Sequence, residues 1–243
     1  MVTETRLQSL ARDIWLADGP MINVYSIPFT PRMTVIRLAN GDLLLRSLVV
    51  YSPELAEELA VHDRVRNLGS ANWRHCARIY GWPNALSGTI AWASPDARER
   101  AKSRDVAGQF DNDPGEDAAS NWSDEPSQMT VHGSSAHTEV VSFRHASRTL
   151  ILTNLIEKMD VRNLAIWQHP LAWLGRVLAP IGRMPLDKWL SFGRRRANLA
   201  RALRRMLVWS PETAVIAHGD ILRENAAQRL RDGFRGLAPL GHA

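Results

Sequence analysis

The dipeptide Asn40-Gly41 lies between two apolar runs, and it constrains the fold of this chain more than any other sequence feature. The flanking runs are Met33–Leu38 and Leu43–Leu45. Asn-Gly is favoured in two-residue β-hairpin turns because both turn positions need a positive φ. The sequence therefore predicts two antiparallel strands joined by a tight turn at residues 39–42.

Short strands and capped helices are predicted to alternate around this hairpin. Ser52-Pro53-Glu54 opens a helix, because serine caps the free amide groups and proline has no amide to leave unpaired, and Ser94-Pro95-Asp96 repeats the pattern. Further strands are expected at residues 13–18, 89–93, 139–143, 149–153 and 213–217, and helices from Pro185 onward and from Asp220 to Phe234. This order suits an α/β (α+β) protein with two sheets in a sandwich and helices outside, folded as a single domain over residues 1–243.

Composition excludes several classes of protein. With 45% apolar and 23% charged residues, the chain can form a full globular core. The single cysteine, Cys76, excludes an internal disulfide and suits a reducing compartment. No secretory signal is recognisable, and the apolar stretch 164–181 is interrupted by prolines and charges, so we expect a cytoplasmic protein without a membrane span.

Charge is unevenly distributed along the chain. Residues 108–135, rich in Asp, Gly, Ser and Pro, are predicted to form a long acidic surface loop, a candidate lid over a site. Residues 183–205 are strongly basic; they are interpreted first as a solvated helix face and alternatively as a surface for nucleic acid or anionic lipid. The apolar 164–181 segment is interpreted as part of the core, or alternatively as a surface patch for self-association or for the entrance of a hydrophobic substrate.

Three segments resemble a little-characterised bacterial and plant family, a domain of unknown function related to metallo-β-lactamases. They are Pro31–Leu45, Ser147–Leu155 and Ala217-His218-Gly219. The resemblance implies a metallo-β-lactamase-like αββα sandwich and leaves the substrate undefined. In the wider superfamily, histidines and aspartates at one edge of the sandwich hold one or two metal ions, and a metal-bound water attacks an ester, amide, thioester or phosphodiester.

Carried onto this chain, the resemblance implies an incomplete set of metal ligands: His75, His137, His218 and Asp220. Arg74 stands where a second histidine would be expected, and arginine has no lone pair to donate. Asn154 falls near the position of the bridging aspartate, and its amide oxygen is a weaker ligand than a carboxylate. Asn72, Arg74 and Asn154 are therefore candidates for lining the pocket.

Three imidazoles could hold one divalent ion (zinc, iron or manganese) and leave a position for water; the alternative is that no ion binds. Each candidate also has a purely structural interpretation. Asp220 would cap the final helix, His218 would hydrogen-bond across a strand-to-helix turn, Asn154 would brace its own loop, and His75 would be a half-buried histidine.

Three functions compete at this point. The first is a metal-dependent hydrolase with a weakened or mononuclear site, acting on an unknown small molecule. The second is a non-catalytic relative, a pseudoenzyme or binding protein that keeps the fold. The third is nucleic-acid binding through the arginine-rich helix 194–205, which is less expected because no aromatic residues interleave with those arginines.

Overall fold

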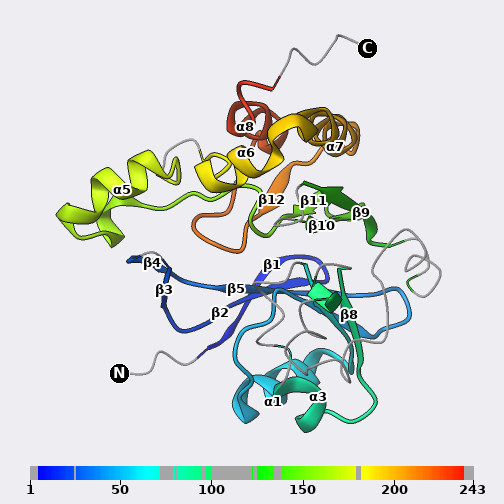
Figure 1. Cartoon of the computed structure of the whole chain (residues 1–243). Helices are drawn as coiled ribbons and strands as arrows, with labels where there is room; N and C mark the ends of the chain where they lie inside the picture. The colour runs from blue at the N-terminus through cyan, green and yellow to red at the C-terminus, as the bar shows by residue number, and fades with distance from the viewer. Residues whose placement is uncertain are drawn as a thin grey trace.

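The computed structural model describes residues 5–24, 26–71, 79, 81–94, 97–99, 122, 125–133, 138–178 and 182–237. Two sheets pack face to face between two helical layers (Figure 1). The first sheet has the order β1-β2-β5-β6-β7-β8 and the second the order β12-β11-β10-β9, while β3 and β4 form a separate hairpin. The predicted α/β sandwich is therefore confirmed.

The strands of the first sheet are β1 (Leu7–Ala11), β2 (Ile14–Asp18), β5 (Arg32–Arg37), β6 (Leu43–Arg46), β7 (Val65–Ser70) and β8 (Ile90–Ala93). Those of the second sheet are β9 (Ser127–His132), β10 (Thr138–Arg144), β11 (Thr149–Ile151) and β12 (Thr213–Val215). The small hairpin joins β3 (Ile22–Val24) to β4 (Ile27–Phe29). On the outer face of the first sheet lie α1 (Pro53–His62) and α3 (Gly81–Ala85).

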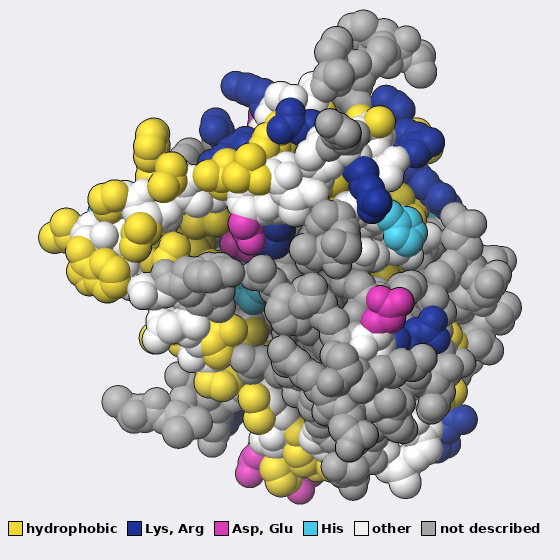
Figure 2. Space-filling model, in the orientation of Figure 1, with side chains coloured by type: hydrophobic (Ala, Val, Ile, Leu, Met, Phe, Trp, Pro, Cys, Tyr) yellow, Lys and Arg dark blue, Asp and Glu magenta, His cyan; other side chains and the backbone are white. Residues whose placement is uncertain are grey.

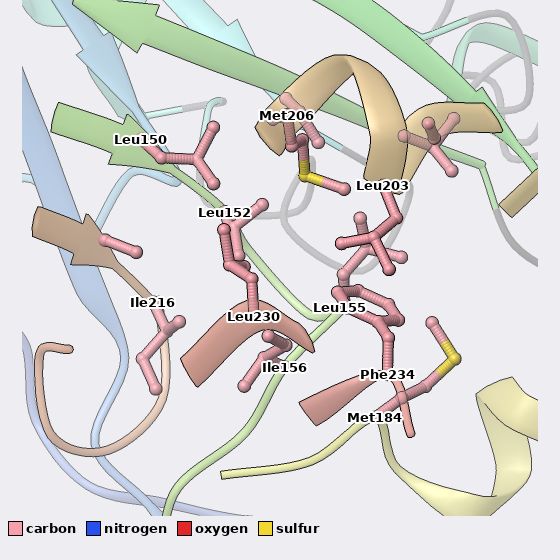
Figure 3. Close-up of a cluster of buried hydrophobic side chains, with 14 of the residues drawn as sticks. Leu150, Leu152, Leu155, Ile156, Met184, Leu203, Met206, Ile216, Leu230 and Phe234 are labelled. Carbon is pink, nitrogen blue, oxygen red and sulfur yellow. The ribbon is translucent and has the colours of Figure 1, made fainter. Parts of the chain in front are cut away.

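The helices beside the second sheet are α5 (His169–Leu174), α6 (Leu186–Phe192), α7 (Arg196–Val208) and α8 (Ala226–Gly233). Three short 3₁₀ turns, η3 (Val161–Asn163), η4 (Ile166–Gln168) and η5 (Gly193–Arg195), connect to them. In α7, the buried residues Leu199, Ala202, Leu203 and Met206 recur at helical intervals. They pack with residues of β11, α8 and the chain after β11 in one cluster (Figure 3).

The predicted hairpin is confirmed, with a different turn. Strands β5 and β6 pair antiparallel with Ile36 opposite Leu44. The Gly41 amide donates to the Leu38 carbonyl at 3.0 Å, and the Leu38 amide donates to the Asp42 carbonyl at 2.9 Å. Of the two turn residues only Gly41 has a positive φ, +90°. The connection is thus a three-residue loop with a bulge at glycine, in which the Asn40 side chain accepts from the Asp42 amide at 3.0 Å.

Capping was predicted correctly for α1, where Ser52 Oγ accepts from the Leu55 amide at 3.2 Å. The final helix differs from its prediction: α8 begins at Ala226 and not at Asp220. Leu222 exchanges two backbone hydrogen bonds with Ala214, each 2.9 Å, so the chain after β12 first turns back along that strand. Asp220 is therefore not the cap of α8.

The prediction of a loop over residues 108–135 was wrong for its last part. Residues 127–132 form β9, which pairs antiparallel with β10 along its whole length. Met129 and Val131 point into the core whereas Gln128 and Thr130 are half-buried, and this alternation is typical of a strand covered on one face. Because the residues on the other face are polar, the sequence shows no apolar run there, and the strand was not predicted. Strand β1, ahead of the predicted first strand, was also missed.

Candidate functional site at the edge of the sandwich

Strands β6, β7, β11 and β12 end at one edge of the sandwich, called here the site edge. Strands β6 and β7 are parallel, as are β11 and β12, so their carboxyl ends lie at the same edge of each sheet. Several hydrogen bonds join the sheets there. The Val140 amide donates to the Ala71 carbonyl at 3.0 Å, the Arg32 amide donates to the Ala217 carbonyl at 3.0 Å, and Ser47 Oγ lies 3.3 Å from Thr153 Oγ1.

His218 follows β12 at the site edge and is buried. Its ring meets the ring of Phe29 edge to face, with centroids 5.3 Å apart, so the β3–β4 hairpin covers one side of the imidazole. The Lys158 amide donates to the His218 carbonyl at 3.4 Å. Gly219 follows with φ +100°, and a Cβ at that position would lie 1.9 Å from the Lys158 carbonyl oxygen. Only glycine allows this close approach of the two backbones.

Asn154 follows β11 at the same edge and is also buried. Its backbone amide donates to Glu139 Oε2 at 2.8 Å, and the neighbouring Thr153 amide donates to Glu139 Oε1 at 2.7 Å. The Ala217 amide donates to the Thr153 carbonyl at 3.3 Å. Hydrogen bonds therefore connect β10, the chain after β11 and the chain that leads into His218.

Glu139 is fully buried, and the sequence analysis did not identify it. Burial raises the pKa of its carboxyl above the usual value, while the amides of Thr153 and Asn154 and the charge of Lys188 act in the opposite direction. Lys188 itself donates to Glu157 Oε1 at 2.5 Å, and both of these side chains are buried. A glutamate at the start of an otherwise apolar run, Glu139-Val-Val, was the signal available in the sequence.

A second buried charge missed by the sequence analysis is Arg46 at the end of β6. Its Nη2 donates to the Val140 carbonyl at 2.7 Å, and its Nε and Nη1 have no hydrogen-bond partner among the described residues. Burial lowers the pKa of the guanidinium to about 10, and the charge of Glu139 opposes this shift. Arg46 places a positive charge between the sheets beside the site edge.

Asp220 lies two residues beyond His218. Its Oδ2 accepts from Lys158 Nζ at 3.1 Å, and its side chain is 57% exposed. The carboxylate of Asp220 therefore already forms an ion pair with Lys158.

Five residues of the sequence predictions lie outside the described residues: Asn72, Arg74, His75, Cys76 and His137. Their proposed roles stay predictions.

The described residues alone do not complete a metal site. Within them, no three His, Cys, Asp or Glu side chains gather into a group that could hold an ion. At the site edge they supply one imidazole, from His218, and the amide of Asn154. A catalytic zinc ion takes three protein ligands and leaves one position for water, so two further donors would be needed.

The arginine-rich segment 194–205 continues from η5 into α7. Arg201, Arg204 and Arg205 are exposed, opposite the buried apolar residues of the helix. Arg196 and Arg205 lie over the rings of Trp189 and Trp209, at 4.8 and 6.0 Å from the centroids.

Within the described residues, no helix is both long and apolar enough to cross a bilayer.

Comparisons with known proteins agree on the architecture. No protein-family model and no curated protein matches the chain, so the resemblance to a domain of unknown function stays a prediction. DIM-1 metallo-β-lactamase exposed to ceftazidime is 15% identical with a TM-score of 0.61, over 96% of this chain and 97% of that one. A metallo-β-lactamase from Erythrobacter litoralis is 13% identical with a TM-score of 0.60, over 96% and 92% of the two chains.

FIM-1 from Pseudomonas aeruginosa, solved in a mono-zinc form, is 9% identical with a TM-score of 0.58, over 95% of this chain and 96% of that one. Identities this low concern the fold and not the activity. The match extends along nearly the whole length of this chain and of these proteins. The chain therefore has the metallo-β-lactamase fold.

Proposed function

We propose that this protein is a metal-dependent hydrolase of the metallo-β-lactamase fold, with a mononuclear site at the site edge and a small-molecule substrate. The ligands would be His75, His137 and His218. Asn154 falls near the position that the resemblance implies for the bridging aspartate, and without that carboxylate a second ion would lack its bridge. One ion is accordingly the expected content.

The hydrogen bonds between Ala71 and Val140, between Glu139 and Asn154 and between Thr153 and Ala217 carry this proposal. In the sequence, His75 follows Ala71 by four positions and His137 immediately precedes Thr138, the first residue of β10. In the sequence, both histidines thus lie within a few residues of described strand ends that adjoin the junction holding Asn154 and His218. Three imidazoles with an open position form a ligand set that zinc uses in catalysis.

A divalent ion held there would supply an activated water and polarise the bond to be broken. This chain's own residues would fix the surroundings of the ion. Phe29 limits the freedom of the His218 ring, and Glu139 holds the backbone around Asn154. Asp220, paired with Lys158, would stay outside the ligand set.

Metal analysis of untagged protein by mass spectrometry tests the proposal. We expect about one zinc, iron or manganese ion per chain in the wild type, in line with three imidazole ligands, and its loss in His218→Ala and His75→Ala. His145→Ala is the matched control, because His145 is exposed and lies 2.7 Å from Ser127 Oγ in the hairpin between β10 and β11. Wild-type protein without metal, or equal metal in His218→Ala and His145→Ala, would refute the mononuclear site.

Hydrolysis of ester, amide, thioester and phosphodiester probes then identifies the reaction. Activity should disappear on chelation and return with one added metal. The competing function is a non-catalytic binding protein. The ion pair between Lys158 and Asp220 favours it, because a cation occupies the carboxylate that follows His218 by two residues. That function predicts a stable, metal-free protein that hydrolyses none of the probes.

A further inference from the structure

A short segment beside the β3–β4 hairpin has its apolar side chains on the outside. Residues 166–174, named here the apolar arm, comprise η4 and α5. Five large apolar side chains of the arm are between 45% and 85% exposed: Ile166, Trp167, Leu171, Trp173 and Leu174. The residues turned inward are Gln168 and Ala172. This is the reverse of the pattern of a helix that packs on a core.

The arm is held firmly in this orientation. Gln168 Nε2 donates to the Ser26 carbonyl in the β3–β4 turn at 2.5 Å, and Gln168 Oε1 accepts from the Ala165 amide at 2.7 Å. Ala172 packs in a cluster with Ile27 and Phe29. The exposed apolar face is therefore a fixed surface, and a turn of the arm about its axis would break these contacts.

The arm projects from one end of the helical layer that also carries the arginines. Figure 1 shows α5 beyond the end of the sheets. Figure 2 shows hydrophobic side chains gathered over that end, with Lys and Arg side chains to their upper right. Residues 160–205 contain ten Lys and Arg residues and two Asp residues, whereas the whole chain has a net charge of +5. The positive charge of the molecule is thus concentrated in the part of the chain that bears the arm.

Backbone contacts connect the arm to this basic part. The Leu186 amide at the start of α6 donates to the Gly175 carbonyl at the end of α5, at 3.0 Å. Arg176, directly after the arm, lies 5.2 Å from the ring centroid of Trp189 in α6. Arg162, four residues before the arm, is exposed and pairs with Asp160. One arginine therefore precedes the apolar arm in the chain, and another follows it directly.

We propose that the apolar arm docks into the surface of an anionic lipid bilayer. Tryptophan, leucine and isoleucine would enter the boundary between headgroups and acyl chains, and the flanking arginines would meet anionic headgroups. A second copy of this chain suits the surface less well. A two-fold contact through the arm would bring the arginines of both copies around one interface, and like charges there oppose association.

Flotation with lipid vesicles tests the proposal on the full chain. The wild type should float with vesicles of phosphatidylcholine and phosphatidylglycerol, and much less with phosphatidylcholine alone. The double variant Ile166→Ser/Trp173→Ser should bind about tenfold more weakly or worse, because two apolar side chains no longer enter the lipid. Rising salt should weaken binding, since the headgroup attraction is screened.

A matched control comes from the opposite helical layer. Val61 in α1 is 82% exposed and Ile166 is 85% exposed, so Val61→Ser removes a similar exposed side chain away from the arm. It should leave vesicle binding unchanged. All these side chains are exposed, so the variants should fold like the wild type, which circular dichroism verifies.

Several results would overturn the proposal. Absence of flotation with anionic vesicles, or equal loss of binding in Val61→Ser, would do so. A dimer in light scattering that dissociates in Ile166→Ser/Trp173→Ser, without vesicle binding, would assign the arm to self-association. Binding of an oligonucleotide without vesicle binding would assign the basic surface to nucleic acid.

Discussion

The carboxylate of Glu139 accepts a hydrogen bond from the backbone amide of Asn154 at 2.8 Å. This bond ties the start of β10 to the chain that leaves β11. The second carboxylate oxygen takes the Thr153 amide. Glu139 is thus a positioning residue for the site edge, and its protonation should affect how firmly that edge is held.

The substitution Glu139→Gln tests this relationship through the pH dependence of stability. Burial raises the folded-state pKa of Glu139. Protonated Glu139 therefore contributes its full share to the free energy of unfolding below the unfolded-state pKa of about 4.3. This contribution is lost as pH rises through the folded-state pKa. Urea unfolding between pH 5 and 8 should show the wild type losing stability relative to Glu139→Gln as pH rises. A difference that does not change with pH would contradict the raised pKa.

The free energy of unfolding should fall most when only one partner of the buried pair of Lys188 and Glu157 is removed. Lys188→Met leaves a buried carboxylate without its cation and should lower the free energy of unfolding by about 3–5 kcal/mol. The double variant Lys188→Met/Glu157→Met should lose less free energy of unfolding than the sum of the losses in the two single variants. Lys188→Met should also raise the pKa of Glu139 further, since the charge of Lys188 lowers it. Additive losses in a double-mutant cycle would argue against the pair.

Two glycines with positive φ provide a matched test of the turn after His218. Gly193 has φ +42°, and a Cβ there would meet no other described residue within 4 Å beyond its chain neighbours, whereas a Cβ at Gly219 would meet the Lys158 carbonyl oxygen at 1.9 Å. Gly193→Ala should lower the free energy of unfolding by about 1–3 kcal/mol from the backbone conformation alone, because φ +42° with ψ −116° is a sparsely populated region. Gly219→Ala should cost roughly 3–5 kcal/mol, because steric overlap adds to the strain. Equal losses in thermal unfolding would disprove the close approach.

Asp220→Asn separates the ion pair from the metal site. The pair with Lys158 is partly exposed, so its loss should change the free energy of unfolding by at most about 1 kcal/mol. Metal content should stay at the wild-type level, because Asp220 is occupied by Lys158. A metal-free Asp220→Asn protein would instead make Asp220 a ligand.

Much of the architecture could be predicted from short stretches of sequence. Asn40-Gly41 indicated the hairpin, Ser52-Pro53 indicated the start of α1, and apolar periodicity indicated α7. Such signals act over a few residues, through backbone conformation and local hydrogen bonds, so they survive in any tertiary context. Where they failed, a distant partner intervened: Ala214 keeps Leu222 out of the final helix, and β10 makes a strand of residues 127–132.

By itself, then, the sequence determined the sandwich class, the β5–β6 hairpin, strands β2, β8, β10, β11 and β12, helices α1 and α7, and His218 and Asn154 as residues that follow buried strands. It did not predict β7, a central strand of the first sheet. Only the tertiary structure decided that the Glu139 carboxylate holds Asn154, that Lys158 engages Asp220, and that the apolar arm faces outward. Glu139 and Asn154 are 15 positions apart, and Lys158 and Asp220 are 62 apart. The energy of a charge or an apolar face depends on what surrounds it, and packing brings those surroundings together from separate parts of the chain.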